Sequence, residues 1–217
     1  MVAFKSRFGQ VERQHVPLRK RRTAAQLRAQ GEFGSASLGW NNLTDEQWDA
    51  WRERGKKVRS HPRGGESGPL TGQMFLTAIN RNQALIGEPA ILYPPERPAF
   101  GLNPVEGLSI TQSGGGVALK LRVAKAPAAP ILVFASRPYN AGRRYCDRFI
   151  YLGLLPAPEG KECDITELYL NKHVKPRPGM RVIILTMQQV NGWRDVPRRT
   201  EAVFRVSPGP AARAVRR

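Results

Sequence analysis

The spacing of apolar residues changes once along this chain, and that change constrains the fold more than any other feature of the sequence. In residues 72–87 apolar side chains recur at the spacing of an amphipathic helix, whereas in residues 117–123 they alternate with polar ones, as in a strand. The connecting residues 93–104 (YPPERPAFGLNP) contain too many prolines for regular structure. We therefore predict an α+β protein with a helical domain at 23–92, this proline-rich linker, and a β domain at 105–207.

Capping residues predict the first two helices of the helical domain. Thr23 is placed to cap a first helix, AAQLRAQGEF, whose extension Gly31 and Gly34 should limit. Thr44 and Gln47 have the spacing of a capping box, which predicts a second helix that ends near residue 57.

A third helix is predicted to begin after Thr71 and to end at Gly87, which is followed by Glu88 and Pro89. Three polar side chains, Asn80, Arg81 and Gln83, are expected to point away from the apolar face of this helix. That face is expected to contain Met74, Phe75, Ala78, Ile79, Leu85 and Ile86.

Three of the four tryptophans, Trp40, Trp48 and Trp51, lie within a dozen positions. They could form a stacking platform for nucleotides or the core of a small helical unit. Trp48 has the spacing of a hydrophobic staple with Leu43, and burial of one such ring contributes several kcal/mol, at roughly 25 cal/mol per Å². We interpret the three as core residues, and we expect Trp193, in a turn-like stretch, to cover one end of the β domain.

The β domain is predicted to be an antiparallel β-sandwich, similar to a fibronectin type III domain, because several short strands are separated by Pro/Gly turns. A glycine turn joins two strands into a hairpin at 108–123. A short helix, ITELYLNKH, should begin near Asp164 and Glu167. Four further strands are expected at 131–136, 147–155, 181–190 and 201–206.

The charge of the chain is strongly unbalanced, with 35 Lys and Arg against 17 Asp and Glu, a net charge of +18. Such an excess is typical of a protein with a polyanionic partner, of which nucleic acid is the commonest; an acidic protein surface and anionic lipid are alternatives. Residues 1–22 lack apolar periodicity and are predicted to be a disordered basic arm, and residues 208–217 a second basic tail.

The candidate nucleic-acid-binding residues are the cations of these two termini and of the end of the second helix. Their expected role is contact with phosphate groups, without sequence specificity. They are Arg13, Arg19, Lys20, Arg21, Arg22, Lys56, Lys57, Arg59, Arg213, Arg216 and Arg217.

The sequence contains no recognisable catalytic, metal or cofactor motif, and we predict none of these functions. Cys146, Cys163 and His173 lack zinc-type spacing, and the two cysteines are interpreted as reduced, with one disulfide as the alternative. The acidic group from Glu159 to Glu167 could serve acid/base chemistry, but the start of a helix explains it better. No apolar run is long enough for a membrane span or a signal peptide, which favours the cytoplasm or a virion-like particle.

The order of motifs resembles a set of uncharacterised bacterial proteins associated with prophage-like gene neighbourhoods. The helix of the form W-x-x-L-T-x-x-Q is represented by Trp40, Leu43, Thr44 and Gln47. A G-x-x-x-F…N helix follows in that set, to which Gly72, Phe75 and Asn80 correspond with shifted spacing, and a fibronectin type III-like β domain ends the chain. The resemblance implies a structural or assembly role and supplies no catalytic residues.

Two functions follow from these features. The first is a non-enzymatic structural protein of a virion-like or other nucleoprotein particle, whose basic arms contact nucleic acid or neighbouring subunits within an oligomeric assembly. The alternative is a β-sandwich module that binds a protein or a glycan and is tethered by its basic tails. An enzyme that uses the acidic group ranks third.

Overall fold

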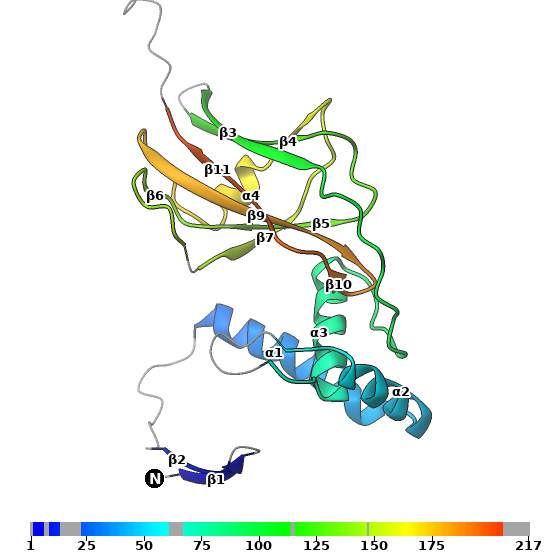
Figure 1. Cartoon of the computed structure of the whole chain (residues 1–217). Coiled ribbons are helices and arrows are strands. Elements are labelled where there is room, and N and C mark those ends of the chain that lie inside the picture. The colour runs from blue at the N-terminus through cyan, green and yellow to red at the C-terminus, as the bar shows by residue number, and fades with distance from the viewer. Residues whose placement is uncertain are drawn as a thin grey trace, which may run out of the picture.

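The computed structural model describes residues 2–6, 9–13, 23–60, 67–113, 116–146 and 148–205. It confirms the α+β class: three of the four helices gather at one end of the molecule, and antiparallel sheets form the other end (Figure 1). Residues 93–104, between the two parts, contain neither helix nor strand. In the described ranges, no helix is both long and apolar enough to cross a membrane.

The helical unit contains α1 (Ala24–Leu38), the 3-10 helix η1 (Gly39–Asn42), α2 (Asp45–Lys56) and α3 (Gly72–Leu85). The predicted caps are confirmed: Thr23 and Gln26 form a capping box on α1, Thr44 and Gln47 form one on α2, and Thr71 caps α3. Thr44 Oγ1 accepts from the Gln47 amide at 3.3 Å. Local hydrogen bonding therefore sets where each helix begins.

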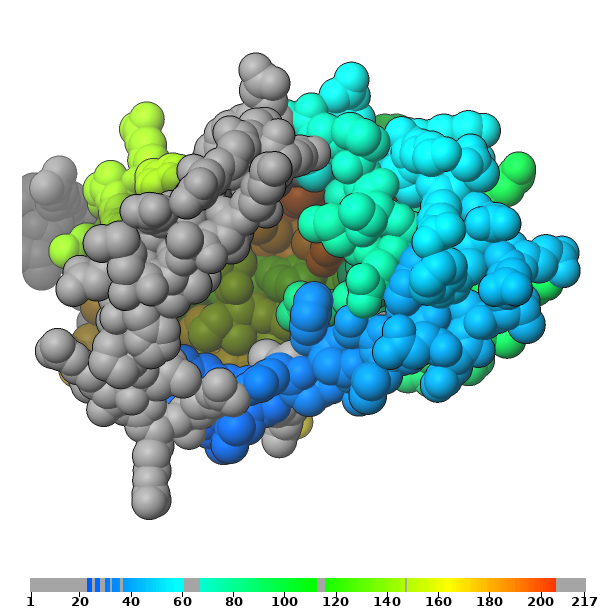
Figure 2. All heavy atoms as spheres, turned by 90° about the horizontal axis from the view of Figure 1, so that it is seen from below, coloured from blue at the N-terminus to red at the C-terminus, as the bar shows by residue number. Residues whose placement is uncertain are grey.

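Helix α1 is longer than predicted, because it continues through Gly31 and Gly34 to Leu38. A glycine inside a helix costs about 1 kcal/mol relative to alanine, which weakens a helix without ending it. Leu27 and Phe33 of α1 are more than half exposed, and the space-filling view shows a recess between α1 and the sheet (Figure 2). The large apolar side chains of α1 whose exposure the structure describes, Leu27, Phe33 and Leu38, therefore contribute little burial to the fold.

The tryptophans of the helical unit form its core, as predicted for Trp40 and Trp51, which are both buried. Trp51 is fully enclosed, and its indole Nε1 donates to the carbonyl of Leu92 at 2.8 Å. Trp48 is half-buried and stacks on Trp40 with ring centroids 4.9 Å apart. The Arg52 guanidinium lies 4.1 Å from the centre of the Trp48 ring and covers its outer side. The rings are therefore used for packing rather than as an open platform.

The β domain contains two antiparallel sheets. Strands β3 (Val105–Ser113), β4 (Gly116–Val123) and β8 (Glu162–Asp164) form a three-stranded sheet. The six-stranded sheet is centred on β9 (Met180–Val190), which pairs along one side with β5 (Ile131–Ala135) and β6 (Tyr139–Asn140). Along its other side β9 pairs with β10 (Trp193–Arg194) and β11 (Arg198–Val203), while β7 (Ile150–Leu154) pairs with β5.

One hydrophobic core joins the two sheets and the short helix α4 (Thr166–Leu170). Val117, Leu119, Leu121 and Val123 of β4 are all buried in it, as their alternation predicts. The predicted hairpin and strands are confirmed, but β7 begins at Ile150 rather than at residue 147, and β11 covers Arg198–Val203 rather than residues 201–206. The pairing of β11 with β9 buries the side chain of Thr200. The strand propensity of threonine does not by itself predict this burial.

The N-terminal residues contain an element that the prediction of a disordered arm missed. Strands β1 (Val2–Ser6) and β2 (Gly9–Arg13) form an antiparallel hairpin, with Val2 opposite Arg13 and Ser6 opposite Gly9. The short alternation in VAFKS favours a strand, although the charge of the segment masks it in a composition count. Residues 14–22, the rest of the predicted arm, lie outside the described residues.

Helix α3 connects the helical unit to the six-stranded sheet (Figure 1). The Gln189 amide of β9 donates to Gln83 Oε1 at 2.7 Å, and Asn82 Nδ2 donates to the carbonyl of Gly192 at 2.6 Å. Gln83 is therefore buried, and the expectation that it points away is wrong; Met74, expected on the apolar face, is 57% exposed. Because Gln189 of the sheet donates a hydrogen bond to Gln83, burial of this polar side chain costs little free energy.

Trp193 belongs to the helical core rather than to the end of the β domain, which corrects the prediction for this residue. Its ring lies 5.2 Å from that of Phe75, and its Nε1 donates to the Pro95 carbonyl at 3.1 Å. The tight turn at Asn191 and Gly192, both with positive φ, reverses the chain after β9 and places Trp193 against α3.

Candidate anion-binding site

A concave basic surface lies where the loops after β5 and β6 approach the segment that follows α4. It encloses about 650 Å³. Four cationic side chains dominate its lining, together with one histidine, one tyrosine and two aliphatic residues. The lining residues are Arg137, Tyr139, Arg143, Arg148, Ile150, Lys172, His173 and Val174. We call the cations Arg137, Arg143, Arg148 and Lys172 the basic rim.

The ring of Tyr139 contacts two of these cations, Arg137 and Arg143. Tyr139 lies in β6, paired with Arg181 of β9, and its side chain is buried. The guanidinium of Arg143 lies 4.4 Å from the centre of the Tyr139 ring, and that of Arg137 lies 5.2 Å from it. Such contacts hold a cation near an aromatic face without neutralising its charge.

The loop between β6 and β7 has no helix or strand over residues 141–146 and 148–149, and hydrogen bonds hold its backbone. Cys146 is buried beside Tyr139, with its Sγ 3.5 Å from the Tyr139 hydroxyl, and it donates to the Arg148 carbonyl at 3.0 Å. Arg143 Nε donates to the carbonyl of Tyr145 at 3.1 Å. The cations of this loop are therefore presented on a fixed backbone rather than on a free tail.

The electrostatics of the surface are one-sided. Among the residues that the structure describes, none that lines this surface is acidic, and no ion pair involves any member of the basic rim. Burial lowers the pKa of His173, opposed by a hydrogen bond with the Ala135 backbone, so this ring stays neutral near pH 7. Four neighbouring like charges produce a positive potential that attracts anions.

A second hollow of about 520 Å³ continues the basic surface along the segment Val174–Pro178. Lys175 and Arg177 lie on its wall, together with Phe204. Arg205 is exposed directly after Phe204, and the basic tail at 208–217 follows it in the sequence. The described part of this tract therefore leads from the basic rim to Arg205.

Most of the sequence-predicted binding residues cannot be compared with this surface. Arg13 is in β2 with only its backbone described, and Arg19, Lys20, Arg21, Arg22, Arg213, Arg216 and Arg217 lie outside the described residues. Lys56 forms an ion pair with Glu53 at 2.5 Å, and Arg59 Nη1 donates to the Ser67 carbonyl at 2.9 Å. Lys57 is exposed at the end of α2.

Sequence reasoning missed the basic rim. The segment SRPYNAGRRYCDR contains four arginines and two tyrosines, a mixture of basic and aromatic residues that is typical of nucleic-acid-binding surfaces. Lys172 lies some thirty residues away in the sequence, so only the tertiary structure brings it to the same surface. Asp147, which lies beside Arg148 in the sequence, is outside the described residues.

Two of the acidic residues considered for catalysis, Glu162 and Asp164, have structural partners. Glu162 pairs with Lys120 at 2.9 Å, and Asp164 Oδ1 accepts from the Thr166 amide at 2.8 Å at the start of α4. Cys146 and Cys163 are both buried as free thiols. Within the described residues, no group of three or more His, Cys, Asp or Glu side chains is placed to hold a metal ion.

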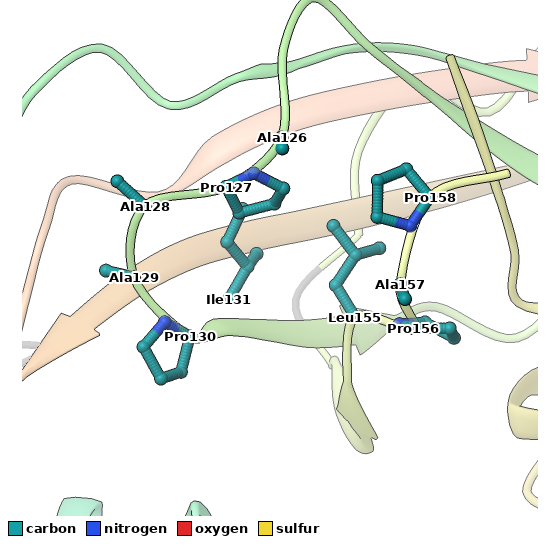
Figure 3. Close-up of a pocket in the computed structure, with 10 residues that line it drawn as sticks. All are labelled: Ala126, Pro127, Ala128, Ala129, Pro130, Ile131, Leu155, Pro156, Ala157 and Pro158. Carbon is teal, nitrogen blue, oxygen red and sulfur yellow. The ribbon is translucent and has the colours of Figure 1, made fainter. Parts of the chain in front are cut away.

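A separate apolar hollow of about 400 Å³ lies between two loops of the β domain. Pro127 and Ile131 face Leu155 and Pro158 across it (Figure 3). Its lining consists only of alanine, proline, isoleucine and leucine. Because its side chains are all apolar, polar contacts with a ligand in this hollow would come from the backbone.

Comparisons with protein-family models, curated proteins and solved structures found no match to this chain.

Proposed function

We propose that this protein is a non-enzymatic structural protein that binds nucleic acid in a nucleoprotein or virion-like assembly. The observation that carries the proposal is the basic rim, four cations on one concave surface whose described lining contains no acidic residue. The net charge of +18 agrees with a polyanionic partner, and the resemblance to prophage-associated proteins favours an assembly role.

The expected mechanism is neutralisation of phosphate groups by Lys and Arg. Each such contact releases condensed counterions, so the logarithm of the binding constant should fall by about 0.7–0.9 per contact for each tenfold rise in salt. Four contacts at the basic rim would weaken binding roughly a hundredfold between 50 and 200 mM salt. The basic termini would add further contacts of the same kind.

The test replaces three exposed cations of the rim by glutamine: Arg137→Gln, Arg148→Gln and Lys172→Gln. A matched control removes the same charge from exposed positions elsewhere: Arg81→Gln, Lys125→Gln and Lys161→Gln. Binding to a nucleic acid of arbitrary sequence, followed by fluorescence anisotropy, should show a salt slope that is shallower by two to three for the rim variant alone. Equal slopes for the two variants, or binding by the wild type that does not respond to salt, would overturn the proposal.

The second candidate function is a protein-binding β-sandwich module, and the apolar hollow in Figure 3 favours it. The side chains of this hollow are all apolar and its polar groups are those of the backbone, which suits a protein segment that packs apolar side chains and makes main-chain hydrogen bonds. We also propose that the β domain is fibronectin type III-like, supported by its two antiparallel sheets around one core. Deletion of residues 1–22 separates the two functions: a protein-binding module keeps its partner, whereas a nucleoprotein component loses affinity.

A further inference from the structure

We infer that the nucleic acid bound at the basic rim is single-stranded and that the ring of Tyr145 stacks against one of its bases. This inference rests on the proposed function and specifies the class of ligand. Tyr145 is 71% exposed, although an aromatic ring of this size usually gains by burial. Its position, on the same loop as two members of the basic rim, suggests a use for that exposure.

The surroundings of Tyr145 combine the two components of a single-strand site. Arg143 and Arg148 of the basic rim lie on either side of it in the sequence, and exposed Arg144 precedes it directly. Surfaces that bind single strands place aromatic rings among cations, because bases stack on the rings while the cations contact the phosphates. No other exposed large aromatic in the described ranges, Phe33 or Tyr93, is on a loop of the basic rim.

The backbone beneath Tyr145 is held in place, which lowers the entropic cost of stacking. Arg143 Nε donates to the Tyr145 carbonyl, and the next residue, Cys146, is buried against Tyr139. Arg199 Nη2 also donates to the carbonyl of Arg144. Hydrogen bonds therefore fix the residues on both sides of Tyr145 while its ring remains in solvent.

A duplex cannot use this ring in the same way, because paired and stacked bases do not expose their faces. It would contact the cations only through its phosphates. The shape of the surface also agrees with a flexible ligand, since the basic rim surrounds a hollow rather than a flat or convex patch. The loss of Tyr145 should thus affect single strands and spare duplexes.

The experiment measures binding of the full-length protein to a fluorescent 12-nucleotide oligothymidine and to a 12-base-pair duplex, at one fixed salt concentration. We expect Tyr145→Ala to weaken binding of the single strand by roughly tenfold to a hundredfold and to leave duplex binding unchanged. Tyr145→Phe retains the stacking face and should bind like the wild type. Tyr93→Ala, which removes a half-exposed tyrosine from the linker, serves as the matched control and should change neither affinity.

The thermal midpoint of Tyr145→Ala should equal that of the wild type, because the removed ring is mostly in solvent. The inference is overturned if Tyr145→Ala binds the single strand as the wild type does, or if it loses the same factor on both ligands; the proposed function survives either result. Failure of the wild type to bind either ligand would remove the proposed function as well.

Discussion

A single glycine shows how closely the two parts of the molecule approach each other. Gly192 follows Asn191 in the turn between β9 and β10, with φ of 77°. A Cβ at this position would lie 2.6 Å from both Cγ2 and the carbonyl oxygen of Ile79 in α3. The turn therefore needs glycine for two reasons, the left-handed backbone and the contact with the helix.

Replacing Gly192 by alanine should reduce the free energy of unfolding by about 2–4 kcal/mol, because the left-handed backbone and the overlap with Ile79 each add a cost. Gly160→Ala is the matched control: Gly160 also has positive φ, at 65°, but a Cβ there meets nothing within 4 Å. That control should lose only about 1 kcal/mol. Urea unfolding measures both changes, and equal losses would contradict the close approach.

Among the secondary-structure elements, α3 has the most complex role. On one side of α3, the ring of Phe75 packs against that of Trp51, with the two ring centroids 5.3 Å apart. The C-terminal half of α3 contacts the sheet through the polar side chains of Asn82 and Gln83. Tyr151 of β7 adds a hydrogen bond to the Leu85 carbonyl at 2.8 Å. Helix α3 is therefore a structural link that belongs to both parts of the molecule.

Gln83→Ala should reduce the free energy of unfolding by about 1–3 kcal/mol, because it leaves the amide of fully buried Gln189 without its acceptor. The control on the same helix is Gln73→Ala, whose side chain is exposed and donates to Ser37 Oγ at 3.2 Å. This control should change the stability by less than about 0.5 kcal/mol. Chemical denaturation compares the two, and a Gln83→Ala variant as stable as the control would show that the buried pair is not formed.

At the scale of the whole molecule, the helical unit and the β domain are joined by side-chain packing as well as by the linker. Trp193 comes from the β domain in sequence but lies in the helical core beside Phe75. Asn103, at the end of the linker, is buried and bonds to Thr186 of β9. Neither part can unfold without exposing apolar and polar groups of the other.

We therefore expect one cooperative unfolding transition for the full chain. Because all four tryptophans lie in or against the helical core, their fluorescence reports on that part, whereas far-UV circular dichroism also reports on the sheets. The two signals should give coincident curves with denaturant. Separate midpoints would mean that the helical unit and the β domain are independent.

Much of the fold was predictable because it follows from local patterns. Alternation in residues 117–123 placed four side chains in the core, and the Thr44–Gln47 box placed the start of α2. The errors concern residues whose environment comes from distant parts of the chain. In its own segment Gln83 has the pattern of a surface residue, and only its hydrogen bond with Gln189 explains its burial. The glycines of α1 predict a helix end, but the helix continues through them.

The candidate site likewise has a part that local sequence features predicted and a part that depends on distant residues. Charge and composition indicated a polyanionic partner, but they pointed to the termini and to the end of α2, where Lys56 already has an acidic partner. The basic rim depends on β6 pairing with β9, on Cys146 packing against Tyr139, and on α4 bringing Lys172 alongside. None of these contacts has a signature in the sequence, because each joins residues that are unremarkable in their own segments.

The sequence by itself determined the starts of α1, α2 and α3 and the longer strands of the β domain, because helix caps and strand alternation are set by residues within a few positions of one another. Tertiary structure alone decided which side chains share a surface and which are buried, since both depend on contacts between residues far apart in the chain. Helix α3 could show an amphipathic pattern, but only the sheet beside it decided that a glutamine would be enclosed. The same long-range packing placed Lys172 beside the three arginines of the basic rim.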